Sequence, residues 1–139
     1  MSWWTYAALS AIFAGLVAVL GKIGVRGVDN TLATTVRAGV MLAALLVLAA
    51  VRGNLSAVRD IPGRSLLFVA LSGLAGAASW LCYFRALQLG DALRVAPIDR
   101  LSGAVTLVLA AALLNERAPA SAWLGTGLML LGAVIVARS

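Results

Sequence analysis

Three residues that could do chemistry lie close together in an apolar stretch: Pro97, Asp99 and Arg100. Ionised side chains inside a membrane cost free energy, so those found there usually bind a substrate, relay protons or pair with each other. Proline removes a backbone hydrogen bond and can bend a helix. The pattern predicts a substrate or proton site at Asp99 and Arg100, with Pro97 as a hinge. The alternatives are a structural ion pair and a proline in the first helical turn, where it is tolerated.

Aromatic and hydroxyl side chains extend this candidate site. Trp80 and Tyr83 are three residues apart and Ser102 follows Asp99 at the same spacing, so each pair shares one helix face. The aromatic pair could form ordinary packing contacts or an interfacial belt. The resemblance to a known family, given below, is what makes these residues candidates for the wall of a substrate cavity.

Two bases lie within other apolar runs. Lys22 comes late in the first run and Arg37 early in the second. Both could attract an anionic or zwitterionic substrate, or could extend their charged ends to the membrane interface. Asp99, about 9 Å inside its helix by the rise per residue, is predicted to share a network with these bases, because the antiparallel order places all of them on one side of the bundle.

The elements that must position these residues are membrane helices. The chain has 139 residues, of which 63% are hydrophobic and 12% charged, and its mean hydropathy is +1.03. Soluble domains average about 45–50% apolar and about 25% charged residues. A span needs about 20 mostly apolar residues, and five stretches qualify: 3–25, 31–51, 66–89, 93–114 and 120–137. These predict an all-α integral membrane protein, one five-helix domain over residues 1–139.

Other classes of protein fit the sequence poorly. The net charge is +6, but the basic residues are single and scattered, which argues against nucleic-acid binding. With no histidine and one cysteine, Cys82, a metal site is not expected. No nucleotide-binding loop and no nucleophile–base set is found, so neither a cofactor nor an enzyme is predicted.

Glycine spacing and loop charges bear on assembly. Gly15, Gly125 and Gly132 lie on helix faces where small residues would allow close helix packing. Short connections predict antiparallel neighbouring helices, and five spans place the termini on opposite sides. Lysine and arginine are nearly balanced between the two sides, which permits insertion in both orientations.

Several short motifs together resemble an EamA domain of the drug/metabolite transporter superfamily. They are Tyr83-Phe84-Arg85-Ala86-Leu87-Gln88-Leu89-Gly90, Val95-Ala96-Pro97-Ile98-Asp99-Arg100-Leu101-Ser102, Asn115-Glu116-Arg117 and Trp123-Leu124-Gly125. Most relatives carry two such five-helix repeats; this chain resembles the short branch with one. The resemblance implies a transporter whose cavity is lined by the third and fourth helices. Small multidrug exporters of the superfamily use an acid in the first helix, where this chain has only Lys22.

The sequence therefore predicts a secondary transporter of small polar metabolites, anionic or zwitterionic, that works by alternating access as an inverted homodimer. Its partners would be the bilayer, a small-molecule substrate and a second copy of the chain, in a prokaryotic inner or plasma membrane. The alternatives are a non-transporting membrane subunit or scaffold, and a flippase for a lipid-linked substrate.

Overall fold

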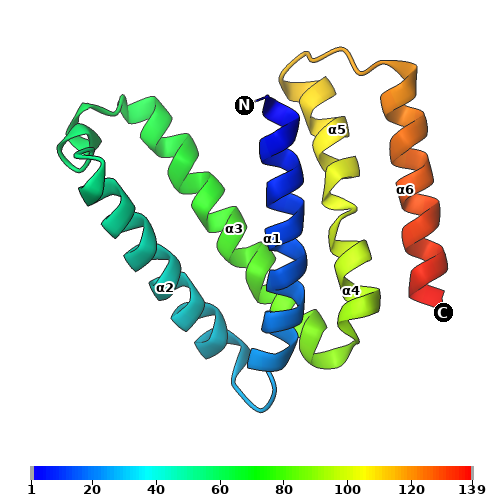
Figure 1. Ribbon diagram of the computed structural model, residues 1–139. Coiled ribbons are helices and arrows are strands. Elements are labelled where there is room, and N and C mark those ends of the chain that lie inside the picture. The colour runs from blue at the N-terminus through cyan, green and yellow to red at the C-terminus, as the bar shows by residue number, and fades with distance from the viewer. Residues whose placement is uncertain (1, 139) are drawn as a thin grey trace. The chain divides into compact units, whose positions relative to one another are not determined.

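The computed structural model describes residues 2–138, which form helices and turns without a strand. The helices are α1 (Trp3–Gly24), α2 (Asn30–Val51), the short 3-10 helix η1 (Ser56–Asp60), α3 (Gly63–Leu89), α4 (Ala92–Asp99), α5 (Ser102–Leu113) and α6 (Ala120–Arg138) (Figure 1). Five segments are long and apolar enough to cross a membrane when Ala92–Leu113 is counted as one. The prediction of an all-α membrane protein is confirmed.

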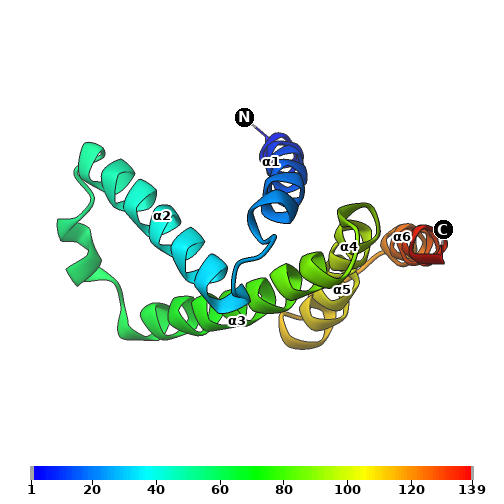
Figure 2. The ribbon, with the colours of Figure 1, turned by 90° about the horizontal axis from the view of Figure 1, so that it is seen from below.

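The chain divides into two compact units. The first consists of Met1–Lys22 and Ala86–Ser139, and in it α6 packs against α4 and α5. The second, Ile23–Arg85, is a helical hairpin of α2 and α3 joined by a loop that contains η1. Within this hairpin the two helices run antiparallel and converge at the end where α2 begins (Figure 2).

The helix ends follow from local sequence. Asp29 is the N-cap of α2, and its carboxylate accepts a hydrogen bond of 2.9 Å from the Leu32 N–H. At the other end, Gly53 has a φ of +69°. The Gly53 and Asn54 N–H groups donate to the Ala50 and Ala49 carbonyls, the Schellman pattern that left-handed glycine permits. Both ends of α2 are thus closed by residues that sequence rules recognise.

The third span begins earlier than predicted. Residues 66–89 were expected to form the helix, but α3 begins at Gly63. The Leu66 N–H donates to the Pro62 carbonyl over 3.0 Å, so the first helical hydrogen bond forms directly after Pro62.

The predicted fourth helix, 93–114, is interrupted. α4 ends at Asp99 and α5 starts at Ser102, and the turn between them has short-range bonds such as Leu101 N–H to the Ile98 carbonyl, 3.0 Å. Pro97 is the sixth residue of α4, so the alternative that it lies in the first turn is wrong. Its missing N–H and its ring weaken the helix just before the interruption.

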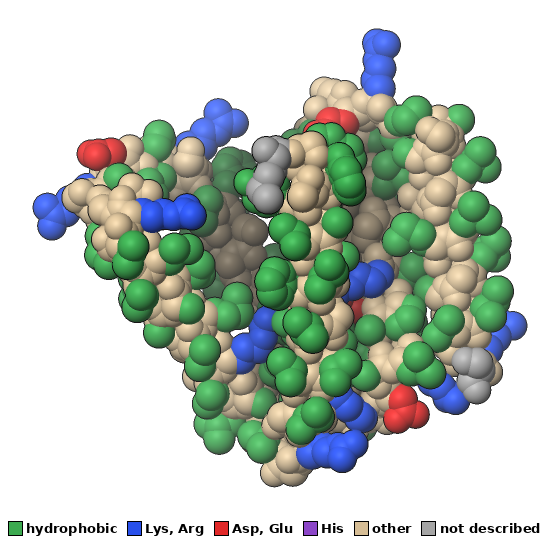
Figure 3. Space-filling view, in the orientation of Figure 1, with side chains coloured by type: hydrophobic (Ala, Val, Ile, Leu, Met, Phe, Trp, Pro, Cys, Tyr) green, Lys and Arg blue, Asp and Glu red, His purple; other side chains and the backbone are tan. Residues whose placement is uncertain are grey.

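Most of the apolar surface is exposed. Among residues 2–138 the buried hydrophobic side chains are Ala18, Val25, Tyr83, Phe84, Leu87 and Ala133. Hydrophobic side chains lie exposed along the helices on the face shown in Figure 3. In water this much apolar surface would drive aggregation, so lipid or another membrane chain must cover it.

Replacing the N-cap of α2 should destabilise the fold. We expect Asp29→Ala to lower the free energy of unfolding by about 1 kcal/mol, because the Leu32 N–H loses its acceptor. The measurement is reversible unfolding in lipid bicelles. Asp91→Ala is the matched control, since Asp91 precedes α4 without a side-chain cap bond. Equal losses in both variants would contradict the assignment.

Candidate functional site

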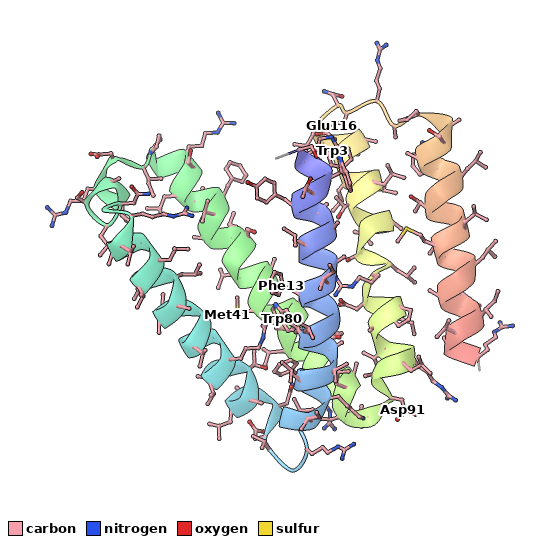
Figure 4. The ribbon with its side chains drawn as sticks, viewed as in Figure 1. Trp3, Phe13, Met41, Trp80, Asp91 and Glu116 are labelled. Atoms are coloured by element: carbon pink, nitrogen blue, oxygen red, sulfur yellow. The ribbon has the colours of Figure 1, made fainter. Side chains whose placement is uncertain are left out.

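The central feature of the α2–α3 hairpin is an arginine stacked on a tryptophan. The guanidinium carbon of Arg37, on α2, lies 3.3 Å from the centroid of the Trp80 ring on α3 and 5.8 Å from that of Phe84. Trp80 lies near the end where the two helices converge (Figure 4). A guanidinium over an aromatic face is attracted by the ring's negative face, most strongly where water is scarce. This contact explains how a permanent positive charge is held inside a membrane helix.

Two more aromatic rings hold the tryptophan in place. The Trp80 ring meets Tyr83 at 5.4 Å and 88°, and Phe84 at 5.6 Å and 84°. Both are edge-to-face geometries, which aromatic pairs prefer. Tyr83 and Phe84 are only 6% and 4% exposed. We call Arg37, Trp80, Tyr83 and Phe84 the arginine–aromatic cluster.

Local sequence accounts for this arrangement. Trp80, Tyr83 and Phe84 stand at offsets of zero, three and four, so their side chains share a face of α3. The side-chain amide of Asn30 donates to the Leu81 carbonyl over 3.0 Å, tying the first turn of α2 to α3. Arg37 lies two helical turns further along α2, which brings it level with Trp80.

The cluster presents hydrogen-bond donors to an anion. Stacking occupies the flat face of the Arg37 guanidinium, while its N–H groups project from the edge of the plane. The side chain is only half-buried, so part of it is not enclosed by the hairpin. A guanidinium edge matches the two oxygens of a carboxylate or phosphate. The geometry therefore suits recognition of an acidic group next to an aromatic wall.

Lys22 bonds to the backbone at the end of α3. Its ammonium donates to the carbonyls of Leu87, at 2.6 Å, and Gly90, at 2.7 Å. These belong to the last turn of α3 and the residue after it, where carbonyls lack helical partners. A cation there also complements the negative end of the helix dipole. Lys22 therefore caps this helix end, and its predicted roles in substrate attraction or at the interface remain predictions.

The residues that opened the sequence analysis surround the interruption between α4 and α5. Asp99 is the last residue of α4 and half-buried, whereas Arg100 and Ser102 are exposed. The Ser102 carbonyl accepts a 3.0 Å bond from the Thr106 hydroxyl. Interrupted helices expose helix ends, whose partial charges bind ions and polar groups in transporters. Pro97 and Asp99 thus stand at a helix junction, and their predicted roles as hinge and binding group remain predictions.

The structure brings together part of the predicted set. Arg37, Trp80 and Tyr83 meet in one cluster, while their predicted roles toward a substrate remain predictions. Phe84 and Asn30 were missed. Phe84 could have been found from its spacing of four after Trp80, whereas Asn30 fell outside the predicted helix 31–51.

The packing role predicted for three glycines stays a prediction. A Cβ atom added at Gly15, Gly125 or Gly132 would meet no atom within 4 Å among the described residues. The backbone at these positions is therefore open to the approach of another helix. Within residues 2–138, no group of three histidine, cysteine or acidic residues is arranged to hold a metal ion.

Comparison with known proteins adds independent information. The model of the EamA-like transporter family matches residues 1–138. A Sinorhizobium protein described as an uncharacterized transporter in the cobO 3′ region is 45% identical over 136 residues, covering 98% of this chain and 96% of that protein. No solved structure matches the chain.

The capping role of Lys22 can be tested by removing its charge. We expect Lys22→Met to lower the free energy of unfolding by about 2 kcal/mol, because two carbonyls lose a charged donor at a helix end. Thermal unfolding in detergent or bicelles measures the change. Arg26→Met is the control, since Arg26 is exposed. A Lys22→Met protein as stable as the control would show that the two bonds contribute little.

Proposed function

This chain belongs to the EamA-like transporter family and is a multi-pass membrane transporter, and from that premise we propose that it is a secondary transporter of small anionic or zwitterionic metabolites. The observation that carries the substrate class is the arginine–aromatic cluster, in which the Arg37 guanidinium lies on Trp80. A fixed positive charge in a transmembrane helix attracts an acidic group, and the aromatic rings offer a surface for the rest of the molecule.

Arg37 suits a site that must bind and release its ligand. The stack on Trp80 stabilises the charge through a neutral aromatic ring. An arginine locked in a buried ion pair would be less free to bind a second carboxylate. The substrate's acidic group then pairs with the guanidinium, and its departure leaves the stack intact.

The interrupted helix supports alternating access. Secondary transporters bind substrate at discontinuous helices near the bilayer midplane and move one repeat against the other. In this chain the helix is discontinuous between α4 and α5, at the Arg100–Leu101 turn that follows Pro97. We propose that Pro97 is the hinge, that Asp99, Arg100 and Ser102 face the transport pathway, and that Asp99 is the acid able to carry a proton.

A single five-helix repeat needs a second copy to enclose a cavity. Inverted repeats form such cavities in two-repeat transporters. We propose that two chains associate in opposite orientations, and that the open faces around Gly125 and Gly132 take part in helix contacts. The balance of lysine and arginine between the two sides is compatible with this arrangement.

Uptake into proteoliposomes tests the substrate class. We expect the purified protein to move labelled small carboxylates, amino acids or phosphate esters, and Arg37→Gln to lower the rate at least tenfold. The reason is loss of the charge that pairs with the acidic group. Arg37→Lys should restore only part of the rate, since an ammonium is a point charge without the planar fork.

Controls separate transport from folding. Arg85→Gln removes an exposed arginine from the same end of α3, and each variant is checked for native unfolding behaviour before its flux is compared. Equal flux in Arg37→Gln and wild type would rule out the cluster as the substrate site. Transport of cations alone would overturn the substrate class.

The inverted dimer is tested by orientation mapping. We expect tags at the two ends of the chain to be accessible from both sides of the membrane in comparable amounts, because neither side carries a strong excess of lysine and arginine. Protease or thiol-reagent protection in intact cells makes the measurement. A single orientation for nearly all molecules would exclude antiparallel pairs.

A further inference from the structure

The loop between α2 and α3 carries an exposed apolar face. Leu55, Val58 and Ile61 are 46%, 56% and 40% exposed. They are spaced by three residues around η1, and side chains three apart eclipse one another in a 3-10 helix. The Ala57 N–H bonds to the Asn54 carbonyl and the Ile61 N–H to the Val58 carbonyl, at 3.2 and 3.4 Å, so this short helix is closed at both ends. The three side chains form one row, which we call the loop face.

Basic residues surround the loop face. Arg52 follows the last residue of α2, Arg59 lies within η1, and Arg64 is the second residue of α3; all three are exposed. With Asp60 the only acidic residue of the segment 52–64, the loop has a net charge of +2, from three arginines and one aspartate. An apolar row edged by arginine is the composition of segments that lie in the interface of a bilayer with anionic lipids.

The ends of the loop set its depth. α2 and α3 each qualify as membrane spans, and they end and begin at Val51 and Gly63. The eleven residues between them are therefore at the bilayer surface on that side. At this depth the apolar row can enter the boundary between headgroups and acyl chains, while the arginines remain among the phosphates.

We propose that the α2–α3 loop is a binding surface for anionic lipid, with Leu55, Val58 and Ile61 inserted into the headgroup region and Arg52, Arg59 and Arg64 holding acidic headgroups. The charge complementarity favours an anionic leaflet over a protein partner. This surface lies at the opposite end of the hairpin from the arginine–aromatic cluster and does not depend on which substrate is transported.

Lipid contact can be measured at single positions of the full-length protein. Cysteine is placed at Val58, on the loop face, or at Ala57, one residue off it, each in a Cys82→Ser background, and is labelled with a small fluorophore. The protein is reconstituted into phosphatidylcholine vesicles containing phosphatidylglycerol. We expect a headgroup-level nitroxide lipid to quench the label at 58 at least threefold more than the label at 57, and aqueous iodide to show the opposite order.

Anionic preference is tested with the nitroxide on either phosphatidylglycerol or phosphatidylcholine. An arginine near an anionic surface contributes roughly a fivefold preference. We therefore expect the label at 58 to be quenched more by the phosphatidylglycerol probe, and the excess to be lost in the triple variant Arg52→Gln, Arg59→Gln and Arg64→Gln. Unfolding of that variant is checked first, and Arg59→Gln alone, in the middle of the loop, provides a milder second test.

Three outcomes would overturn the proposal. Equal lipid quenching at 57 and 58 would show that the row does not enter the bilayer. Shielding of the label at 58 from both iodide and lipid would place the face against protein, such as a second copy of the chain. Equal quenching by the two lipid probes would show that the loop has no preference for anionic headgroups.

Discussion

The arrangement of this protein depends on keeping a permanent positive charge inside a transmembrane hairpin. Arg37 cannot lose its proton, and a lone guanidinium in hydrocarbon is costly. The face of Trp80 at 3.3 Å supplies attraction without neutralising the charge. Tyr83 and Phe84 hold the Trp80 ring in its orientation by edge-to-face contacts. The Asn30 side chain bonds α2 to α3 at the same end of the hairpin. An acidic ligand would complete this site, which connects the packing of the hairpin to transport.

The second group of polar contacts stabilises helix ends. Lys22 occupies the carbonyls at the end of α3, and Asp29 caps α2. Both charged side chains are therefore engaged by backbone, where they complement helix dipoles. In contrast, Asp99 and Arg100 stand where α4 gives way to α5. Lys22 and Asp29 thus cap helix ends, whereas Asp99 and Arg100 lie at a helix interruption. Secondary transporters typically bind substrates and ions at such interruptions.

The all-α membrane class and the number of spans could be predicted from the sequence, because apolar runs of about twenty residues are typical of transmembrane helices. It also indicated Arg37, Trp80 and Tyr83 as candidate site residues. A charged residue in an apolar run and two aromatic residues three apart can both be recognised in the sequence. The partner of Lys22 was not predictable, because Leu87 and Gly90 contribute backbone carbonyls that any residue would carry. The interruption after Asp99 could not be read from the sequence either, because Pro97 indicates a weakened helix but not whether that helix bends or breaks.

The central claim is that an acidic ligand reaches Arg37 while it rests on Trp80. A protein with Trp3, Trp4 and Trp123 replaced by phenylalanine reports on Trp80 alone by its fluorescence. Titrating it with a panel of small carboxylates, amino acids and phosphate esters should give a saturable change for the transported anion. That change should disappear in the Arg37→Gln variant. A saturable response that survives in Arg37→Gln, or a transported anion that leaves Trp80 fluorescence unaltered, would contradict the account.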